Sequence, residues 1–303
     1  MTVQTIEFPS EGTYLRGRLY LADAPGRSPC VVMAHGTSAT ISMVIDDYAE
    51  AFYTAGISVL LYDHINFGNS GGDDRQVINP WLQGRGYRDA VHYLKRLPSI
   101  DPDRIALWGD SYAAMEVLVV GALIDGLAGI VSQIPACGIA VPPETASPNR
   151  LPILKNLFET ADLTALEKDD TGFMPVVSFD QTSASSFLKP IQAFRWFIEF
   201  GGRFGSGWEN RVSRVTPKTD VPFSPFETAS ALPAPVLFMT GKEDEMVHCN
   251  PEVQRAVYDM IPTEKEHIEL DCGHFGLLYP GSSIFQQSVQ TQTRFLKGVL
   301  GLN

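Results

Sequence analysis

Three residues whose side chains can carry out nucleophilic catalysis occur along this 303-residue chain in the order serine, aspartate, histidine. Each of them, Ser111, Asp244 and His274, comes shortly after an apolar run typical of a strand. A serine hydroxyl becomes a nucleophile when a histidine takes its proton and a carboxylate orients that histidine. Because ligands bind at the carboxyl ends of parallel strands, the sequence predicts that these three residues form a catalytic triad for acyl chemistry.

The surroundings of Ser111 are typical of a nucleophile elbow. In Gly109-Asp110-Ser111-Tyr112-Ala113 an apolar strand breaks at a glycine and a helix follows, which places the serine on a tight turn. The usual pattern is G-x-S-x-G, and Ala113 replaces the second glycine, adding one methyl group where helix and strand approach closely. The alternative is an ordinary strand-to-helix turn whose serine caps the helix.

Other acidic residues near the same strand ends compete for the role of the acid. Glu243 and Glu245 flank Asp244, and Asp271 precedes His274 by three residues. Asp244 has the spacing that suits the turn after its strand, whereas Asp271 falls on the end of a strand. We therefore assign the acid to Asp244.

The loops after two earlier strands provide further candidates. His64 is a candidate for lining the substrate pocket, although a hydrogen bond within its own loop is the more ordinary role. His35 precedes a tight turn, and we interpret it as a structural loop residue. The backbone N–H groups of Thr37 and Tyr112 are the expected oxyanion hole, because acyl transfer needs donors where negative charge develops.

The elements that must position these residues alternate along the chain. Residues 3–8 and 14–21 alternate apolar and polar side chains and predict a β-hairpin. Continuous apolar runs at 30–34, 57–62 and 127–134 predict strands buried on both faces, separated by helical patterns. This alternation predicts an α/β fold with a mostly parallel, doubly wound sheet and the hairpin at its edge.

The alternation stops between residues 140 and 234. Two helical stretches, 151–166 and 185–204, lie there among loops rich in proline and glycine, and the second is rich in aromatic residues. We interpret 140–234 as a helical cap inserted into a core formed by 1–139 and 235–303; a separate small domain is the alternative. Trp196 and Phe197 are candidate pocket residues, and packing within the cap explains them equally well.

Composition excludes several classes of partner. The formal net charge of −12 argues against nucleic acid and anionic membranes, which favour basic patches. The N-terminal residues show no secretory signal, and no apolar run is long enough to span a membrane. The four cysteines form no C-x-x-C pair. We expect a cytoplasmic protein with no metal, no cofactor, and no nucleic-acid or membrane partner.

Several stretches resemble those of a known family over nearly the whole chain. They are Met33-Ala34-His35-Gly36, Tyr62-Asp63, Phe67-Gly68-Asn69-Ser70-Gly71-Gly72, Asp103-Arg104-Ile105-Ala106-Leu107-Trp108-Gly109, Val131-Ser132-Gln133-Ile134-Pro135 and Gly273-His274-Phe275. They are similar to α/β-hydrolases, in which the triad also has the order Ser, Asp, His. Within these, the chain resembles a branch related to dienelactone hydrolases and X-Pro-dipeptidyl-peptidase-like hydrolases, which includes fungal polyketide transferases and thiohydrolases.

The resemblance implies an α/β-hydrolase fold and serine-dependent hydrolysis or transfer of an ester, thioester or lactone. It implies Ser111 as nucleophile, His274 as base and Asp244 as the acid that orients it. The chain departs from the branch at Ala113-Ala114, where glycine is usual, and at His64-Ile65-Asn66, where an arginine-containing turn is common. These departures leave the triad intact and the substrate open.

We therefore expect a serine hydrolase that forms an acyl-enzyme from a small-molecule ester or thioester with an apolar or aromatic group. Alternatives on the same triad are acyl transfer to an alcohol or amine, and hydrolysis of a C–C bond next to a carbonyl. A non-catalytic ligand receptor on the same scaffold is an alternative of another class, although such receptors usually lack a triad residue. Ser111 argues against a haloalkane dehalogenase, which needs an aspartate at the elbow. A homo-oligomer is left open.

Overall fold

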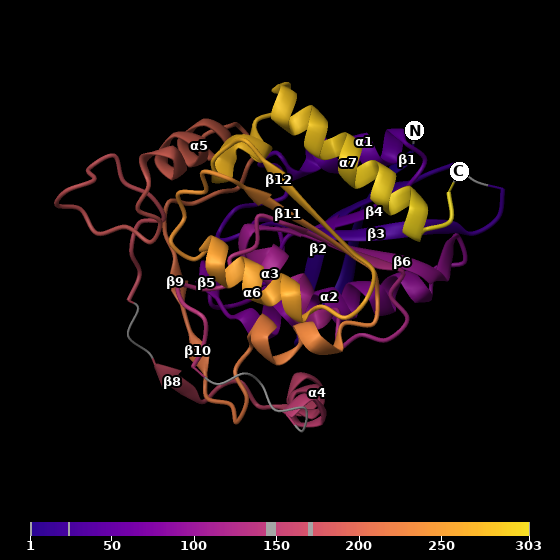
Figure 1. Ribbon diagram of the computed structural model, residues 1–303, viewed down its shortest axis with the longest axis horizontal. Coiled ribbons are helices and arrows are strands. Elements are labelled where there is room, and N and C mark those ends of the chain that lie inside the picture. The colour runs from indigo at the N-terminus through magenta and orange to yellow at the C-terminus, as the bar shows by residue number, and fades with distance from the viewer. Residues whose placement is uncertain (1, 24, 144–149, 169–171, 303) are drawn as a thin grey trace.

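A twisted eight-stranded sheet forms the centre of the protein (Figure 1). The computed structural model describes residues 2–23, 25–143, 150–168 and 172–302. The strand order is β1-β2-β4-β3-β6-β7-β11-β12. Its strands are β1 (Thr2–Ser10), β2 (Thr13–Leu21), β3 (Ser28–Ala34), β4 (Ser58–Tyr62), β6 (Ile100–Asp110), β7 (Gly129–Gln133), β11 (Val236–Gly241) and β12 (Lys265–Leu270). The strands from β4 to β12 run parallel, and β1 and β2 form the predicted antiparallel hairpin at the edge. The predicted α/β fold is confirmed.

Strand β3 shows how an apolar run is buried on both faces of the sheet. All of its residues are buried. Val31 and Met33 belong to one hydrophobic cluster, and Val32 and Ala34 belong to the other. Successive side chains of a strand point to opposite faces, so one continuous run contributes to two separate cores.

Helices cover both faces of this sheet (Figure 1). Helices α1 and α7 pack on one face, and α2, α3 and α6 pack on the other. Sequence signals set their starts: the Asn79 side chain accepts hydrogen bonds from N–H groups of the first turn of α2, and Asn250 does the same for α6. The bounds are α1 Ile45–Thr54, α2 Pro80–Lys95, α3 Ser111–Val120, α6 Pro251–Met260 and α7 Ser283–Val299, with a 3-10 helix, η3, at His274–Leu278.

The strand order reverses at β3, which has β4 on one side and β6 on the other. In open α/β sheets, ligands bind at the carboxyl ends of the strands at such a reversal. The loop after β3 carries Thr37, and β6 leads directly into Ser111. The topology therefore brings the predicted oxyanion loop and the predicted nucleophile to the same place.

The segment between β7 and β11 contains two helices that lie far apart in Figure 1, α4 (Arg150–Thr160) and α5 (Ile191–Gly201). Phe158 of α4 belongs to the hydrophobic cluster of α2, whereas Trp196 of α5 belongs to the cluster on the opposite face. The buried apolar residues of these two helices thus join the main cores. Both helices are shorter than predicted, and Pro190 stands directly before α5. Residues 144–149 and 169–171 of the predicted cap lie outside the described residues.

Short strands tie this segment together and to the core. β9 (Ser213–Arg214) pairs in parallel with β5 (Val77–Ile78), and β10 (Thr216–Pro217) pairs with β8 (Leu166–Lys168). Two 3-10 helices, η1 (Pro225–Glu227) and η2 (Ala229–Ala231), lead back to β11. The pattern of the sequence did not predict these elements, because they contain only two or three residues each.

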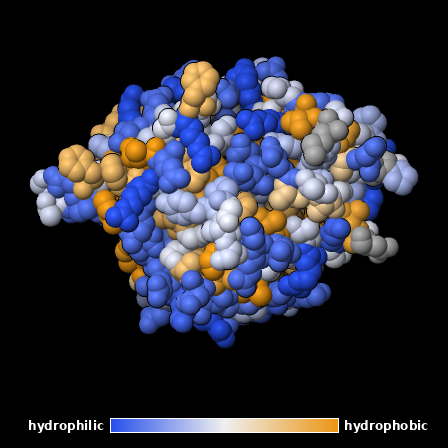
Figure 2. All heavy atoms as spheres, turned by 90° about the horizontal axis from the view of Figure 1, so that it is seen from above, coloured by the Kyte–Doolittle hydropathy of each residue, from blue (hydrophilic) through white to orange (hydrophobic). Residues whose placement is uncertain are grey.

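The surface view in Figure 2 shows mostly hydrophilic residues, with hydrophobic residues gathered in small groups. Such groups are ordinary on globular proteins. Among the described helices, none combines the length and the apolar character needed to cross a bilayer.

Candidate active site

Ser111 stands at the first position of α3, directly after β6, with a φ of 53°. A positive φ is unfavourable for a residue with a side chain and is typical of a nucleophile elbow. A side chain at Gly109 would collide with the carbonyl oxygen of Ala113, so the first glycine of the motif carries the close approach of strand and helix. The methyl group of Ala113 is fully buried and does not contribute to the described lining of the cavity next to Ser111. The alanine that departs from G-x-S-x-G therefore packs in the core and not in the described cavity wall.

Ser111, His274 and Asp244 lie in one hydrogen-bonded line. His274 Nε2 is 3.0 Å from Ser111 Oγ, and His274 Nδ1 is 2.8 Å from Asp244 Oδ2. The histidine begins η3 after β12, and the aspartate lies in the turn after β11. Three segments far apart in the sequence thus meet at the carboxyl edge of the sheet.

The neighbouring acids take different places. Glu245 Oε2 accepts a hydrogen bond of 2.9 Å from the backbone N–H of His274, so it fixes the backbone that carries the imidazole. Asp271 is 82% exposed and lies 3.7 Å from Lys242 Nζ, away from the imidazole. Asp244 Oδ1 accepts a hydrogen bond from the N–H of Met246, which leaves Oδ2 for His274. Sequence reasoning weighed Glu245 only as a rival acid and missed its contact with the histidine backbone.

Opposing effects act on the imidazole of His274. Burial lowers its pKa, but the charge of Asp244 and the hydrogen bond at Nδ1 outweigh burial, so the pKa lies above the ordinary value of 6.5. A pKa near the working pH suits a general base, because the neutral form is available and still takes up a proton readily.

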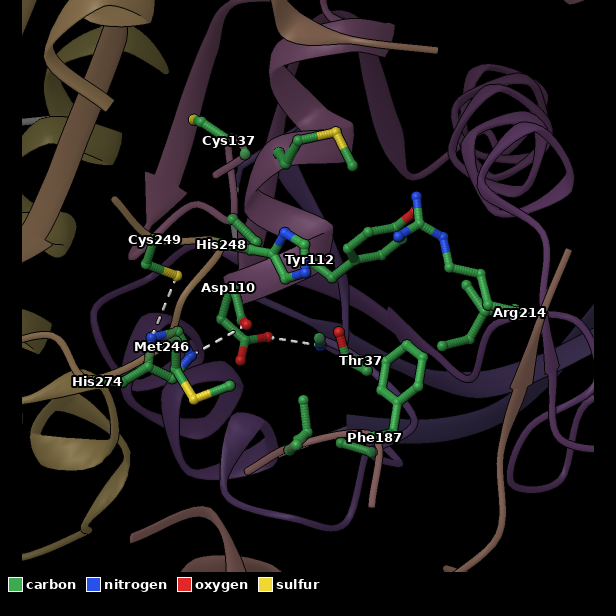
Figure 3. A pocket seen from close by; sticks show the side chains of 18 of the residues that line it. Thr37, Asp110, Tyr112, Cys137, Phe187, Arg214, Met246, His248, Cys249 and His274 are labelled. Atoms are coloured by element: carbon green, nitrogen blue, oxygen red, sulfur yellow. Dashed lines mark hydrogen bonds between the residues drawn. The ribbon is translucent and has the colours of Figure 1, made fainter. Parts of the chain in front are cut away.

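The loop after β3 is fixed directly against the elbow. The N–H of Gly36 donates a 2.9 Å hydrogen bond to Asp110 Oδ1. A Cβ at Gly36 would lie only 3.0 Å from the Cβ of Ser111, so a larger residue would push the loop away. Thr37 and Tyr112 both line the cavity (Figure 3). Tyr112 is in the first turn of α3, where backbone N–H groups have no partner within the helix.

His35 contacts the backbone of this loop and of the loop after β4, in agreement with the structural role that the sequence suggested. Its Nδ1 lies 2.9 Å from the carbonyl oxygen of Gly36, and its Nε2 lies 3.2 Å from the backbone N–H of His64. Since the second contact requires an acceptor, Nδ1 must carry the hydrogen. Burial lowers the pKa of His35 to about 4, which keeps this neutral tautomer.

Asp110 is a residue of the site that sequence reasoning did not identify. Its carboxyl lines the cavity and holds Gly36, and burial raises its pKa to about 7, while the charge of His274 and the Gly36 hydrogen bond lower it. Its position, the variable residue of the G-x-S motif, was visible in the sequence. Only the structure shows that the side chain turns toward the loop after β3.

A cavity of about 640 Å³ opens at Ser111 and His274. Its wall is mainly apolar and includes both aromatic residues predicted for the pocket, Trp196 and Phe197. The indole Nε1–H of Trp196 donates a 2.9 Å hydrogen bond to the carbonyl oxygen of Leu278, which joins α5 to η3. These aromatic residues therefore both line the cavity and pack against the core.

His64 lies outside the described lining of the cavity, so the prediction that it lines the pocket is wrong. It does not contribute to the described cavity lining, and it is 1% exposed. The rings of His35, Tyr62 and Tyr87 surround it at centroid distances of 4.8 to 5.8 Å. Its strand end is on the correct edge of the sheet, but the loop directs the ring inward, toward Glu116 of α3.

Arg214 was also missed. It lies on β9 and contributes a guanidinium to the cavity wall, beside the ring of Tyr112 (Figure 3). No motif in the sequence marks it, because a two-residue strand inside a long irregular segment has no recognisable pattern.

One group among the described residues brings three potential metal ligands together. Asp244, Cys249 and His274 offer atoms within 4.8 Å of one another. Cys249 Sγ lies 3.5 Å from His274 Nδ1 (Figure 3), the nitrogen that also faces Asp244. A metal ion there would compete with the hydrogen bond that orients the imidazole. The arrangement as it stands suits proton transfer from Ser111.

Comparison with known proteins agrees with the fold. The profile of the alpha/beta hydrolase family matches residues 31–284. The chain belongs to this family. The match includes the elbow and the loops that carry Asp244 and His274, and leaves out the edge hairpin and most of α7.

Relatives of this alpha/beta hydrolase include fungal thiohydrolases and polyketide transferases. It is 30% identical to thiohydrolase aneE of Aspergillus aculeatus, over 99% of this chain and 94% of the relative. It is 27% identical to polyketide transferase af380 of Aspergillus fumigatus, over 98% of each chain. These names agree with the branch that the sequence resembled.

A solved structure of similar fold is that of DcsB in complex with its substrate analogue. The TM-score is 0.73 at 21% identity, over 99% of this chain and 100% of that one. At this identity the likeness shows the fold alone.

Proposed function

We propose that this alpha/beta hydrolase is a serine-dependent acyl hydrolase with Ser111 as nucleophile, His274 as general base and Asp244 as the acid that orients it. The observation that carries the proposal is the hydrogen-bonded line from Ser111 Oγ through both nitrogens of His274 to Asp244 Oδ2, at 3.0 and 2.8 Å. This arrangement meets the geometric requirement for an activated serine.

In the first half of the reaction, His274 Nε2 removes the proton of Ser111 as Oγ attacks the substrate carbonyl. The negative charge that develops on the carbonyl oxygen is stabilised by the backbone N–H groups of Thr37 and Tyr112. His274 then gives its proton to the departing alcohol or thiol. The acyl group remains on Ser111 as an ester.

In the second half, water replaces the leaving group. His274 Nε2 takes a proton from the water, whose oxygen attacks the acyl-enzyme through a second tetrahedral intermediate. Collapse of this intermediate returns the proton to Ser111 Oγ and releases the acid. Asp244 stabilises the imidazolium in both halves.

We propose a small-molecule ester, thioester or lactone as substrate, with an apolar or aromatic acyl group. The mainly apolar cavity with Trp196 and Phe197 in its wall supports this, and the thiohydrolase names of relatives favour a thioester. In this proposal, segment 140–234 acts as a cap that supplies much of the wall. The four cysteines, all in the described part of the chain and all free, support a reducing compartment such as the cytoplasm.

Acyl transfer is the second candidate, because several relatives are named polyketide transferases. The same acyl-enzyme would then be attacked by an alcohol or amine instead of water. Product analysis with and without a competing nucleophile separates the two: transfer predicts that the conjugate is formed in preference to the acid.

The test of the proposal is turnover by Ser111→Ala on p-nitrophenyl esters, thioesters and lactones of graded acyl size. We expect kcat to fall by about 10⁴- to 10⁶-fold, as for other serine hydrolases that lose the nucleophile. The matched control is Ser224→Ala, which changes another serine of the cavity wall and should stay within about tenfold of wild type. Near wild-type turnover by Ser111→Ala would overturn the proposal, and a non-catalytic receptor would turn over none of these substrates.

A further inference from the structure

The apolar wall of the cavity comes from two different hydrophobic clusters. Met115 and Cys137 belong to the cluster of α2 and α3, and Phe223 packs against it. Trp196 and Phe197 of α5 belong to the cluster on the opposite face of the sheet. We name the first part of the wall the α3 arm of the cavity and the second part the α5 arm. The cavity therefore lies where the two cores meet.

The ring of Tyr112 separates the two arms. It packs against both hydrophobic clusters. In Figure 3 it lies between Cys137 of the α3 arm and Phe187, which packs against the cluster of the α5 arm. Because Tyr112 directly follows Ser111, the two arms diverge next to the proposed nucleophile.

The α3 arm begins beside the nucleophile and has a firmly held wall. Met115 stands four residues after Ser111 on α3, and residues at that spacing share one face of a helix, with side chains that lean toward its N-terminus. The ring centre of Phe223 lies 5.4 Å from that of Trp81 in α2, and a Cβ at Gly84 of the same helix would lie 2.9 Å from the Phe223 ring. Close packing behind these side chains therefore leaves the arm little room to widen.

The α5 arm lies on the side of the proposed general base. Phe275 follows His274 in η3, and the centres of their rings are 5.1 Å apart. The ring centre of Trp196 lies 5.5 Å from that of Phe275, and the Trp196 indole also bonds to the carbonyl oxygen of Leu278 in the same 3-10 helix. These contacts form a continuous aromatic wall from the imidazole to α5.

The proposed reaction gives a direction to each group on the reacting carbon. The tetrahedral intermediate carries Ser111 Oγ, the oxyanion, the leaving group and the acyl chain. The oxyanion faces the backbone N–H groups of Thr37 and Tyr112. The leaving group faces His274 Nε2, because that nitrogen must protonate it. The acyl chain is left with the direction away from the histidine.

We propose that the α3 arm binds the acyl chain of the substrate, that Met115 limits the length of this chain, and that the α5 arm binds the leaving group. This inference rests on the proposed function and names its substrate class: a thioester or ester of a linear aliphatic acid, whose thiol or alcohol carries an apolar group that packs on aromatic rings. Each methylene that leaves water for the apolar wall stabilises the bound substrate until the chain meets Met115.

The experiment uses two series of thioesters and follows thiol release in both. In the acyl series, linear acids of graded length share one small thiol. In the thiol series, one short acid is joined to alkyl and benzyl thiols of graded size. We expect kcat/KM of wild type in the acyl series to rise about fourfold per methylene up to a maximum and to fall beyond it.

Two variants should affect the two series separately. Met115→Ala should move the acyl maximum to acids about two carbons longer, because truncation opens space at the end of the chain, and it should leave the order of the thiol series unchanged. Phe197→Ala should do the reverse: it should lower the preference for benzyl thiols by about two- to tenfold, the range for contacts between aromatic rings, and leave the acyl maximum in place.

Val119→Ala is the matched control. Val119 lies one turn further along α3 and belongs to the same cluster as Met115, but it is outside the described cavity lining. It should leave both series unchanged, and a shift equal to that of Met115→Ala would overturn the assignment. Phe223→Ala is an independent second variant, because Phe223 is only partly buried; it should move the acyl maximum in the same direction as Met115→Ala.

Calorimetric binding of linear carboxylic acids, the products of the acyl series, gives the same comparison without turnover. Affinity should rise with chain length to the same maximum, and Met115→Ala should extend it. A wild type without a maximum, a maximum that stays in place in both Met115→Ala and Phe223→Ala, or one that moves in Phe197→Ala would overturn the inference. No thiol release from either series, with acid binding whose length limit depends on Met115, would instead contradict the proposed hydrolysis.

Discussion

Among the described residues, the buried pair of His274 with Asp244 and the buried pair of His64 with Glu116 differ in nearly every respect that matters for catalysis. His274 and Asp244 are joined by a 2.8 Å hydrogen bond, and His274 also reaches Ser111. His64 Nε2 and Glu116 Oε2 are 3.4 Å apart without the alignment of a hydrogen bond. His274 of the first pair lines the cavity, whereas His64 of the second is enclosed by aromatic rings.

Burial lowers the pKa of both histidines, but the net shifts have opposite directions. The pKa of His64 lies well below its ordinary value, because burial and the neighbouring His35 disfavour its charged form. Glu116 provides no compensating charge, since its own pKa is raised well above the ordinary value by burial. In the first pair, burial is outweighed by Asp244, and the pKa of His274 rises. A carboxyl group beside a histidine therefore makes a base only when that carboxyl group is hydrogen-bonded and charged.

The largest expected difference is in turnover. His274→Ala should lower kcat/KM by about 10⁴- to 10⁶-fold, because it removes the proposed general base. His64→Phe should change kcat/KM by less than about tenfold, because both nitrogens of His64 have no hydrogen-bond partner among the described side chains, and phenylalanine keeps the ring. Initial rates with one activated ester measure both. A loss of activity in a folded His64→Phe protein that matches the loss in His274→Ala would remove the distinction between the pairs.

The second expected difference is in the pH profile. In the proposed mechanism His274 acts as a base only when neutral, so kcat/KM should rise with pH through its pKa, and the raised pKa places this midpoint above 6.5 in the free enzyme. His64→Phe should leave the midpoint unchanged, because the lowered pKa of His64 keeps it neutral throughout this range. A midpoint below 6.5, or one that moves in His64→Phe, would show that the groups are assigned wrongly.

The smallest expected difference is in acid stability. The unfolded chain protonates His64 below about pH 6.5, whereas the folded protein does not, so this histidine reduces stability as the pH falls. Relative to His64→Phe, wild type should lose up to about 1.4 kcal/mol of unfolding free energy per pH unit below that value. Urea titrations of both proteins between pH 7 and 5 measure this. Parallel pH dependences would mean that His64 is charged in the folded state.

The sequence predicted the sheet and the meeting of Ser111, Asp244 and His274, because both follow from local patterns. A buried parallel strand is a continuous apolar run, and catalytic residues follow strand ends, so Ser111, Asp244 and His274 could be placed without knowing any side-chain direction. His64 met the same criterion and was placed wrongly. Which way a loop side chain points depends on tertiary packing, here on the ring of Tyr87 in α2.

Residues that act through a tertiary contact had no sequence signal. Asp110 could be recognised only once Gly36 was seen against it, and Glu245 only once its contact with the His274 backbone was known. Arg214 reaches the cavity through a two-residue strand pairing with β5. The sequence also did not predict that α4 and α5 pack on opposite faces of the sheet. The apolar pattern of a helix shows which of its own faces is buried, but not which core it joins.

The most direct test of the central claim is covalent labelling with a fluorophosphonate, read by intact mass and peptide mapping, in wild type, Asp244→Asn and Glu116→Gln. We expect one adduct on Ser111 in wild type, labelling slower by about 10⁴-fold in Asp244→Asn, and labelling at nearly the wild-type rate in Glu116→Gln. An adduct at another residue, no adduct in wild type, or equal rates for wild type and Asp244→Asn would contradict the assignment of Ser111, His274 and Asp244 as the catalytic triad.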